Sequence, residues 1–92
     1  MKDYRSLETA ARHLEVTEAT LVEFGRAGWI ETVSKEGHTY ISSHHEYRCR
    51  FILRLRASFG LTDKQIGIVM ANAKAPFSLE QVVEILERYR PR

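Results

Sequence analysis

The chain has 92 residues, enough for one small domain, and 43% hydrophobic with 28% charged residues is typical of a folded globular protein, which excludes a disordered chain. A single cysteine, Cys49, excludes an internal disulfide and fits a reducing compartment. The charged N-terminal residues lack the apolar core of a signal peptide, and no apolar run is long enough for a membrane span, so we expect a cytoplasmic protein.

Two short helices and a hairpin are predicted in the first half of the chain. Ser6 can cap a helix over residues 7–14, in which apolar side chains recur at helical spacing. Thr17 can cap a second helix over residues 18–27. The pattern then changes to a two-residue alternation over residues 31–42 around the turn SKEGH, which predicts a small β-hairpin.

Three more helices are predicted after the hairpin. Each follows a serine or threonine with glutamate or glutamine three residues later, which is the signature of a capping box: Ser43 with Glu46, Thr62 with Gln65, and Ser78 with Gln81. The helices should extend over residues 43–59, 63–73 and 79–90. Apolar spacing predicts a buried face in the first from Tyr47, Phe51, Ile52, Leu55 and Phe59, and in the last from Leu79, Val82, Val83, Leu86 and Tyr89.

Charge is distributed unevenly along the chain. Residues 1–47 carry five basic and eight acidic side chains, a net charge of −3, whereas residues 48–92 carry nine basic and four acidic ones, a net charge of +5. An anionic partner should therefore prefer the C-terminal half. Four arginines on the predicted helix 43–59 fall in two pairs beside its apolar stripe, so they fit a solvated helix as well as a patch for phosphates or an acidic protein.

The order of helix, turn, helix, hairpin and two further helices resembles the MerR-like winged helix-turn-helix family. Three stretches carry the resemblance: the pair Thr20 and Leu21, GRAGWI, and TYISSHHEYRCRFILRLRASFGLTDKQIGIVM, which looks like the wing strand and the two helices after it. The resemblance covers roughly residues 5–73. It implies a mostly α-helical winged helix-turn-helix core over residues 1–74, followed by a short C-terminal helix in residues 75–92.

Regulators of this family bind DNA, and the resemblance together with the basic helix 43–59 nominates the following contact residues: Thr20, Arg26, Lys35, His38, Arg48, Arg50, Arg54 and Arg56. The family typically has an arginine and aromatics after its Thr-Leu pair, where this chain has Val22, Glu23 and Phe24. Thr39 stands where the wing usually presents an arginine. Because phosphate contacts supply most nonspecific affinity for DNA, we expect weak DNA binding, and a transcriptional regulator is the alternative function.

The chaperone modulators of the CbpM type, a branch of the same superfamily, are similar in their short length, their RLR stretch before a Gly-Leu turn and their loss of DNA-contact residues. They are understood to bind the J domain of a DnaJ-like co-chaperone. The resemblance thus implies a non-catalytic protein that regulates a J-domain co-chaperone. J domains carry a basic helix, so the predicted protein-binding residues are acidic, although an ordinary solvated face accounts for them equally well: Glu18, Glu23, Glu31 and Glu36.

The last predicted helix spans only about 18 Å, which is short for a dimerising coiled coil. It can pack on the core or pair with a second copy of the chain through Val82, Leu86 and Tyr89.

Metal binding and catalysis are not indicated by the sequence. His45 and Cys49 have a spacing that can share a metal, but only two ligands would then lie on one helix face. The sequence has no glycine-rich phosphate loop and no nucleophile elbow. We therefore predict no metal, no cofactor and no enzymatic activity.

Overall fold

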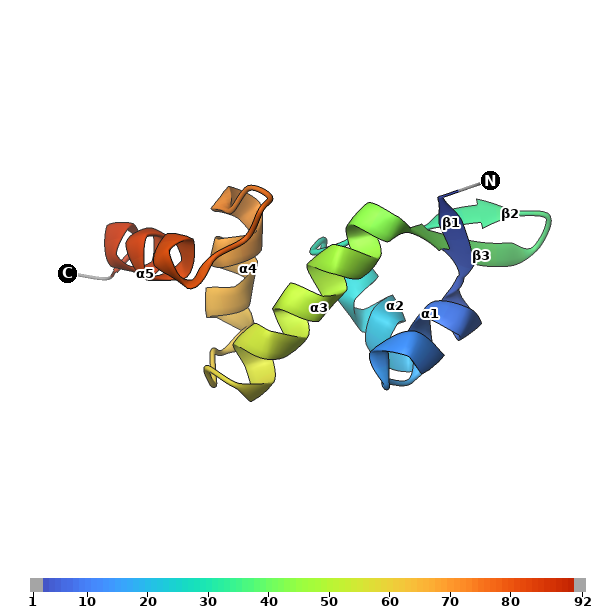
Figure 1. Ribbon diagram of the computed structural model, residues 1–92, viewed down its shortest axis with the longest axis horizontal. Coiled ribbons are helices and arrows are strands. Elements are labelled where there is room, and N and C mark those ends of the chain that lie inside the picture. The colour runs from blue at the N-terminus through green and yellow to red at the C-terminus, as the bar shows by residue number, and fades with distance from the viewer. Residues whose placement is uncertain (1–2, 91–92) are drawn as a thin grey trace. The chain divides into compact units, whose positions relative to one another are not determined.

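A computed structural model of the chain describes residues 3–90 (Figure 1). Within this range 59% of the residues are helical, in five helices, and three short strands form one antiparallel sheet. The predicted mostly helical fold with a small hairpin is therefore confirmed. The chain divides into two compact units between Arg50 and Phe51, within the helix α3 (Ser43–Ala57). None of the helices in the described range is long and apolar enough to cross a membrane.

The N-terminal unit begins with two capped helices, as predicted. They are α1 (Leu7–Leu14) and α2 (Glu18–Arg26). The Ser6 hydroxyl accepts a hydrogen bond from the Thr9 amide, and the Thr17 hydroxyl accepts one from the Thr20 amide, each at 3.2 Å. These bonds satisfy amides that the helices themselves leave unpaired, so each helix begins where its cap stands.

The sheet is built around a central strand, and its three strands are β1 (Tyr4–Ser6), β2 (Val33–Lys35) and β3 (His38–Ser42), in the order β1-β3-β2. The hairpin of β2 and β3 was predicted, and its turn has φ values of 51° at Glu36 and 79° at Gly37. Two left-handed residues form the turn whose twist suits a two-residue hairpin. The turn sets a register in which Ser34 lies opposite Thr39.

Strand β1 was not predicted, and the first capping box was predicted wrongly. β1 is three residues long and has no alternating pattern, so only its pairing with β3 identifies it. The Ser43 amide donates to the Asp3 carbonyl at 2.8 Å, and the Ser42 hydroxyl accepts from the amide of His45. Glu46 is buried and its carboxylate lies 3.2 Å from the Arg5 guanidinium, so it joins β1 to α3 instead of capping the helix.

The C-terminal unit contains α4 (Asp63–Asn72) and α5 (Leu79–Arg88), which pack against each other (Figure 1). The capping box of Thr62 and Gln65 is confirmed, with both of its hydrogen bonds formed. Phe51 and Phe77 stack with their ring centroids 4.7 Å apart. Buried apolar side chains in this unit come from the C-terminal part of α3, from α4 and from α5: Phe51, Ile52, Leu55, Ile66, Val69, Met70, Val82 and Ile85.

The predicted apolar faces of α3 and α5 are partly wrong. Tyr47 and Phe59 are about 40% exposed. Phe59 lies beyond the end of α3 at Ala57, and the buried residues of the helix lie between Tyr47 and Phe59. In α5 the buried residues are Val82 and Ile85, whereas the predicted face also included side chains that prove to be exposed: Leu79, Val83 and Tyr89. Apolar spacing alone did not show which part of the apolar stripe is buried, because the stripe is about 160° wide and only the side with Val82 and Ile85 packs against the rest of the unit.

One helix end carries backbone strain that a substitution should relieve. Glu15 follows α1 in the left-handed region at φ 58°, where a side chain is unfavourable. We expect Glu15→Gly to raise the free energy of unfolding by about 1 kcal/mol in urea titrations. Arg54→Gly, at an exposed position with helical backbone in α3, should instead lower it by about 1 kcal/mol. A loss of stability in Glu15→Gly would contradict this interpretation of the helix end.

Candidate functional site

A groove runs between α2 and the hairpin of the N-terminal unit. It consists of two adjoining hollows with volumes of about 570 and 360 Å³, whose linings share Leu7, Val22 and Thr39. We call it the α2–hairpin groove. Concave surfaces with an apolar base and a few polar groups are the usual sites of ligand and partner binding, so this groove is the candidate site.

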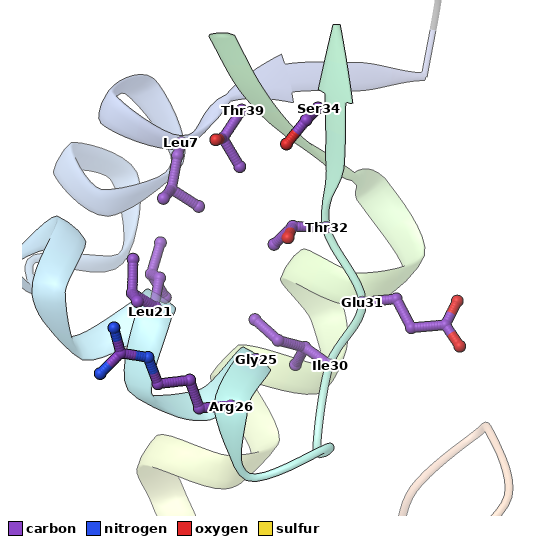
Figure 2. Close-up of a pocket in the computed structure, with 10 residues that line it drawn as sticks. Leu7, Leu21, Gly25, Arg26, Ile30, Glu31, Thr32, Ser34 and Thr39 are labelled. Atoms are coloured by element: carbon purple, nitrogen blue, oxygen red, sulfur yellow. The ribbon is translucent and has the colours of Figure 1, made fainter. Parts of the chain in front are cut away.

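The two walls of the groove differ in chemistry (Figure 2). Thr32, Ser34 and Thr39 point into the larger hollow from the hairpin side. Opposite them, α2 contributes the apolar Leu21 and the guanidinium-bearing Arg26. A wall of hydroxyl groups facing an apolar wall can hold an amphipathic segment, with hydrogen bonds on one side only.

Opposite charges lie near the two ends of the helical wall. Glu18 is the first residue of α2 and lines the smaller hollow, together with Glu8. Arg26 is the last residue of α2 and lines the larger one. At 100° per residue Glu18, Val22 and Arg26 follow one stripe of the helix, so a partner in the groove meets a negative, an apolar and a positive group in that order.

The segment after α2 is held in place by side chains of α3. The Arg48 guanidinium donates to the Trp29 carbonyl at 2.9 Å, and the Glu31 amide donates to Nδ1 of His45 at 3.1 Å. The rings of Phe24 and Trp29 pack with centroids 5.6 Å apart. These contacts fix the backbone that carries Thr32 into the groove, so this wall is formed before any partner binds.

The four predicted protein-binding carboxylates do not gather in one place. Glu18 lines the smaller hollow, whereas Glu23 lies about 140° away from it around α2. Glu31 is at the rim of the larger hollow, but its carboxylate points away from it (Figure 2) and lies 3.9 Å from His45 Nε2. Glu36 occupies the hairpin turn. Of these four predicted residues, only Glu18 lines the groove with its carboxylate not turned away, and Glu8, which was not predicted, lines the same hollow.

The residues predicted for DNA contact are also dispersed. In the N-terminal unit, Arg26 and His38 line the groove, and Lys35 is exposed on β2 opposite His38. Thr20 shares a hydrogen bond of 3.0 Å with the cap hydroxyl of Thr17. Arg48 is occupied by the Trp29 carbonyl.

The remaining predicted arginines lie further along α3. Arg50 and Arg54 are exposed, and the Arg56 guanidinium lies 3.1 Å from the carboxylate of Asp63. Two of the four arginines on this helix, Arg48 and Arg56, are thus engaged within the protein.

The three residues predicted for dimerisation have different environments in the C-terminal unit. Val82 is 3% exposed, so this side chain is not accessible to a second copy. Leu86 is half-buried, and the Tyr89 hydroxyl donates to the side-chain oxygen of Asn72 at 2.9 Å. Dimerisation through Leu86 and Tyr89 stays a prediction.

Cys49 is fully buried, and burial next to Glu46 raises its pKa to about 12. The thiol therefore stays protonated at neutral pH and is a poor nucleophile and metal ligand. Within residues 3–90 no three histidine, cysteine or acidic side chains are arranged to hold a metal ion.

Several groove residues were not found from the sequence. Thr32 and Ser34 belong to no motif, whereas Gly25 and Thr39 are part of the stretches that carry the family resemblance but were not predicted as binding residues. The available signal was the hairpin register, because Ser34 and Thr39 are paired across the predicted turn. That register indicates a shared face but not which helix the face meets.

Comparisons of the chain with family models, with curated proteins and with solved structures found no match.

Lowering the pH should reduce the folding stability of the N-terminal unit, because His45 then becomes protonated. Burial, Arg48 and His44 lower the pKa of His45 from 6.5, against the opposing effect of Glu31, and Nδ1 must be unprotonated to accept from the Glu31 amide. The unfolded chain therefore binds the proton more readily, and stability that is full above pH 6.5 falls as the pH drops through that value.

We expect the free energy of unfolding to fall between pH 7.5 and pH 5.5, measured by urea titration at each pH. His45→Asn supplies an amide oxygen near the position of Nδ1 without a titrating group, so the fall should be smaller in this variant. An equal fall in the wild-type protein and the variant would contradict the role of His45.

Proposed function

We propose that this chain is a MerR-like winged helix-turn-helix module that regulates a J-domain co-chaperone by binding its J domain in the α2–hairpin groove. The observation that carries the proposal is the position of Glu18, at the first turn of α2 and inside the groove. A carboxylate at this position attracts a basic partner segment. The competition of such binding with other ligands of the J domain would be the regulatory effect.

The same position argues against sequence reading in DNA. A recognition helix places its first residues against base edges and phosphates, and a carboxylate there repels the phosphate backbone. Arg48 cannot compensate, because it is bonded to the Trp29 carbonyl. Arg26 and His38 are the groove residues that favour the alternative of a DNA-binding regulator.

Gly25 gives the groove a bare stretch of helix backbone. A methyl group built at this position would meet no atom within 4 Å, so the packing of the protein does not require glycine here. Glycine inside a helix lowers stability by about 0.5–1 kcal/mol relative to alanine. A partner that approaches the backbone of α2 closely accounts for a glycine that the fold itself does not need.

Two titrations test the proposal. In fluorescence anisotropy, a purified J domain should bind the protein, whereas a random-sequence DNA duplex should bind weakly even at about 50 mM salt. Glu18→Lys should weaken J-domain binding about tenfold, because it replaces an attraction by a repulsion inside the groove. Glu36→Lys makes the same charge change at the hairpin turn and should have a much smaller effect.

Equal effects of the two substitutions would mean that general charge attraction, not the groove, binds the J domain. Micromolar DNA binding that weakens steeply between about 50 and 200 mM salt, with no J-domain binding, would favour the transcriptional regulator instead.

Gly25→Ala separates binding from folding in the same groove. The substitution should raise the free energy of unfolding by about 0.5–1 kcal/mol, since alanine favours the helix and nothing obstructs its methyl group. It should also weaken J-domain binding, because the methyl group occupies the space above the helix backbone. A more stable variant with unchanged affinity would show that the partner does not touch this part of α2.

A further inference from the structure

The outer surface of α5 carries an apolar strip that nothing in the described residues covers. Leu79 and Val83 are 52% and 51% exposed. They are four residues apart, so they lie within about 40° of each other on the helix. Leu86, which is half-buried, continues the strip toward the C-terminal end of α5. Adjacent exposed apolar side chains on one helix face are a common feature of interaction surfaces.

Hydrogen bonds at both ends of α5 hold this strip outward. The side-chain oxygen of Gln81 accepts from the Lys74 amide at 2.9 Å, and its nitrogen donates to the carbonyls of Lys74 and Pro76 at 3.0 and 2.7 Å. Gln81 thus binds the preceding loop, and the predicted second half of a capping box with Ser78 is not formed. At the other end Tyr89 donates to Asn72. Turning the helix to bury Leu79 would break these bonds, so its exposure is built into the unit.

Three carboxylates lie along one edge of the strip. Glu80, Glu84 and Glu87 fall within about 60° of each other on α5, on the side away from the buried Val82. Glu84 is paired with Arg88, whose guanidinium lies 3.0 Å from its carboxylate, so Glu80 and Glu87 are the carboxylates of this edge that a partner would meet first. The glutamates of this edge are three of the four acidic side chains in residues 48–92, a part of the chain whose net charge is +5. Negative charge is therefore concentrated beside the apolar strip.

We infer that this surface of α5 is a second protein-binding site, which accepts an amphipathic helix with apolar residues on one face and lysine or arginine along one flank. The apolar strip buries the apolar face of such a helix, and the acidic edge pairs with its basic flank. Because the carboxylates lie on one side only, they also determine which way round the helix lies. The site uses no residue of the α2–hairpin groove, so it stands independently of the proposed function.

An antiparallel second copy of the chain and an anionic membrane fit this surface less well. A two-fold antiparallel pair of α5 helices would place the acidic edge of one copy beside the acidic edge of the other, where like charges repel. Anionic lipid head groups would meet the same carboxylates. Charge complementarity therefore favours a basic helix.

The experiment uses the full chain and two labelled helical peptides of about 16 residues, long enough for four turns. Both peptides have leucine on one face, and one carries lysine and the other glutamate along a single flank. In fluorescence anisotropy the lysine peptide should bind and the glutamate peptide should not. The double variant Glu80→Lys, Glu87→Lys should weaken binding of the lysine peptide about tenfold.

The matched control is the double variant Glu15→Lys, Glu36→Lys. It changes the net charge equally, at two exposed positions outside both α5 and the α2–hairpin groove, and should bind the lysine peptide as the wild-type protein does. Val83→Ser should weaken binding with little effect on folding, because the side chain is exposed. Equal binding of both peptides, or equal loss in both double variants, would overturn the inference. So would a dimer in sedimentation equilibrium that Val83→Lys dissociates, since a second copy would then cover the strip.

Discussion

The N-terminal unit depends on the pairing of β3 along both of its edges. β3 joins β1, which precedes the first helix, to β2, which follows the second, so the helical pair and the hairpin are held by one strand. Ile41 in β3 is fully buried, and its neighbour Arg5 in β1 reaches the buried carboxylate of Glu46 in α3. This register determines which hydroxyl groups of the hairpin face α2, and it therefore determines the chemistry of the groove.

The charged side chains near the groove are arranged differently from those of a typical nucleic-acid-binding surface. Its arginine neighbour on α3, Arg48, is bonded to the Trp29 carbonyl and supports the groove wall instead of facing a ligand. Glu18 occupies the helix start, where the positive end of the helix dipole already stabilises a carboxylate. The result is a groove with an apolar base, hydroxyl groups along one wall and opposite charges near its ends, in place of a uniformly basic surface.

The C-terminal unit shows how one side chain can determine what a helix exposes. Gln81 was expected to complete a capping box, but its amide satisfies three backbone groups of the loop between α4 and α5. That anchoring turns Val82 and Ile85 toward α4 and leaves Leu79 and Val83 outside. The apolar strip and its acidic edge are therefore a consequence of a polar contact that lies on another side of the helix.

The sequence by itself determined the helices, their caps at Ser6, Thr17 and Thr62, and the hairpin, because caps, turn residues and apolar periodicity act over a few neighbouring residues. Only the tertiary structure decided the third strand, the partner of Glu46 and the buried side of α5, since each depends on residues brought together from distant positions. The candidate groove belongs mostly to this second class. Glu18 was predicted as an acidic contact for a protein partner and Arg26, through the family resemblance, as a contact for DNA, whereas Gly25 and the hydroxyl groups were recognised as groove residues only once the hairpin lay opposite α2.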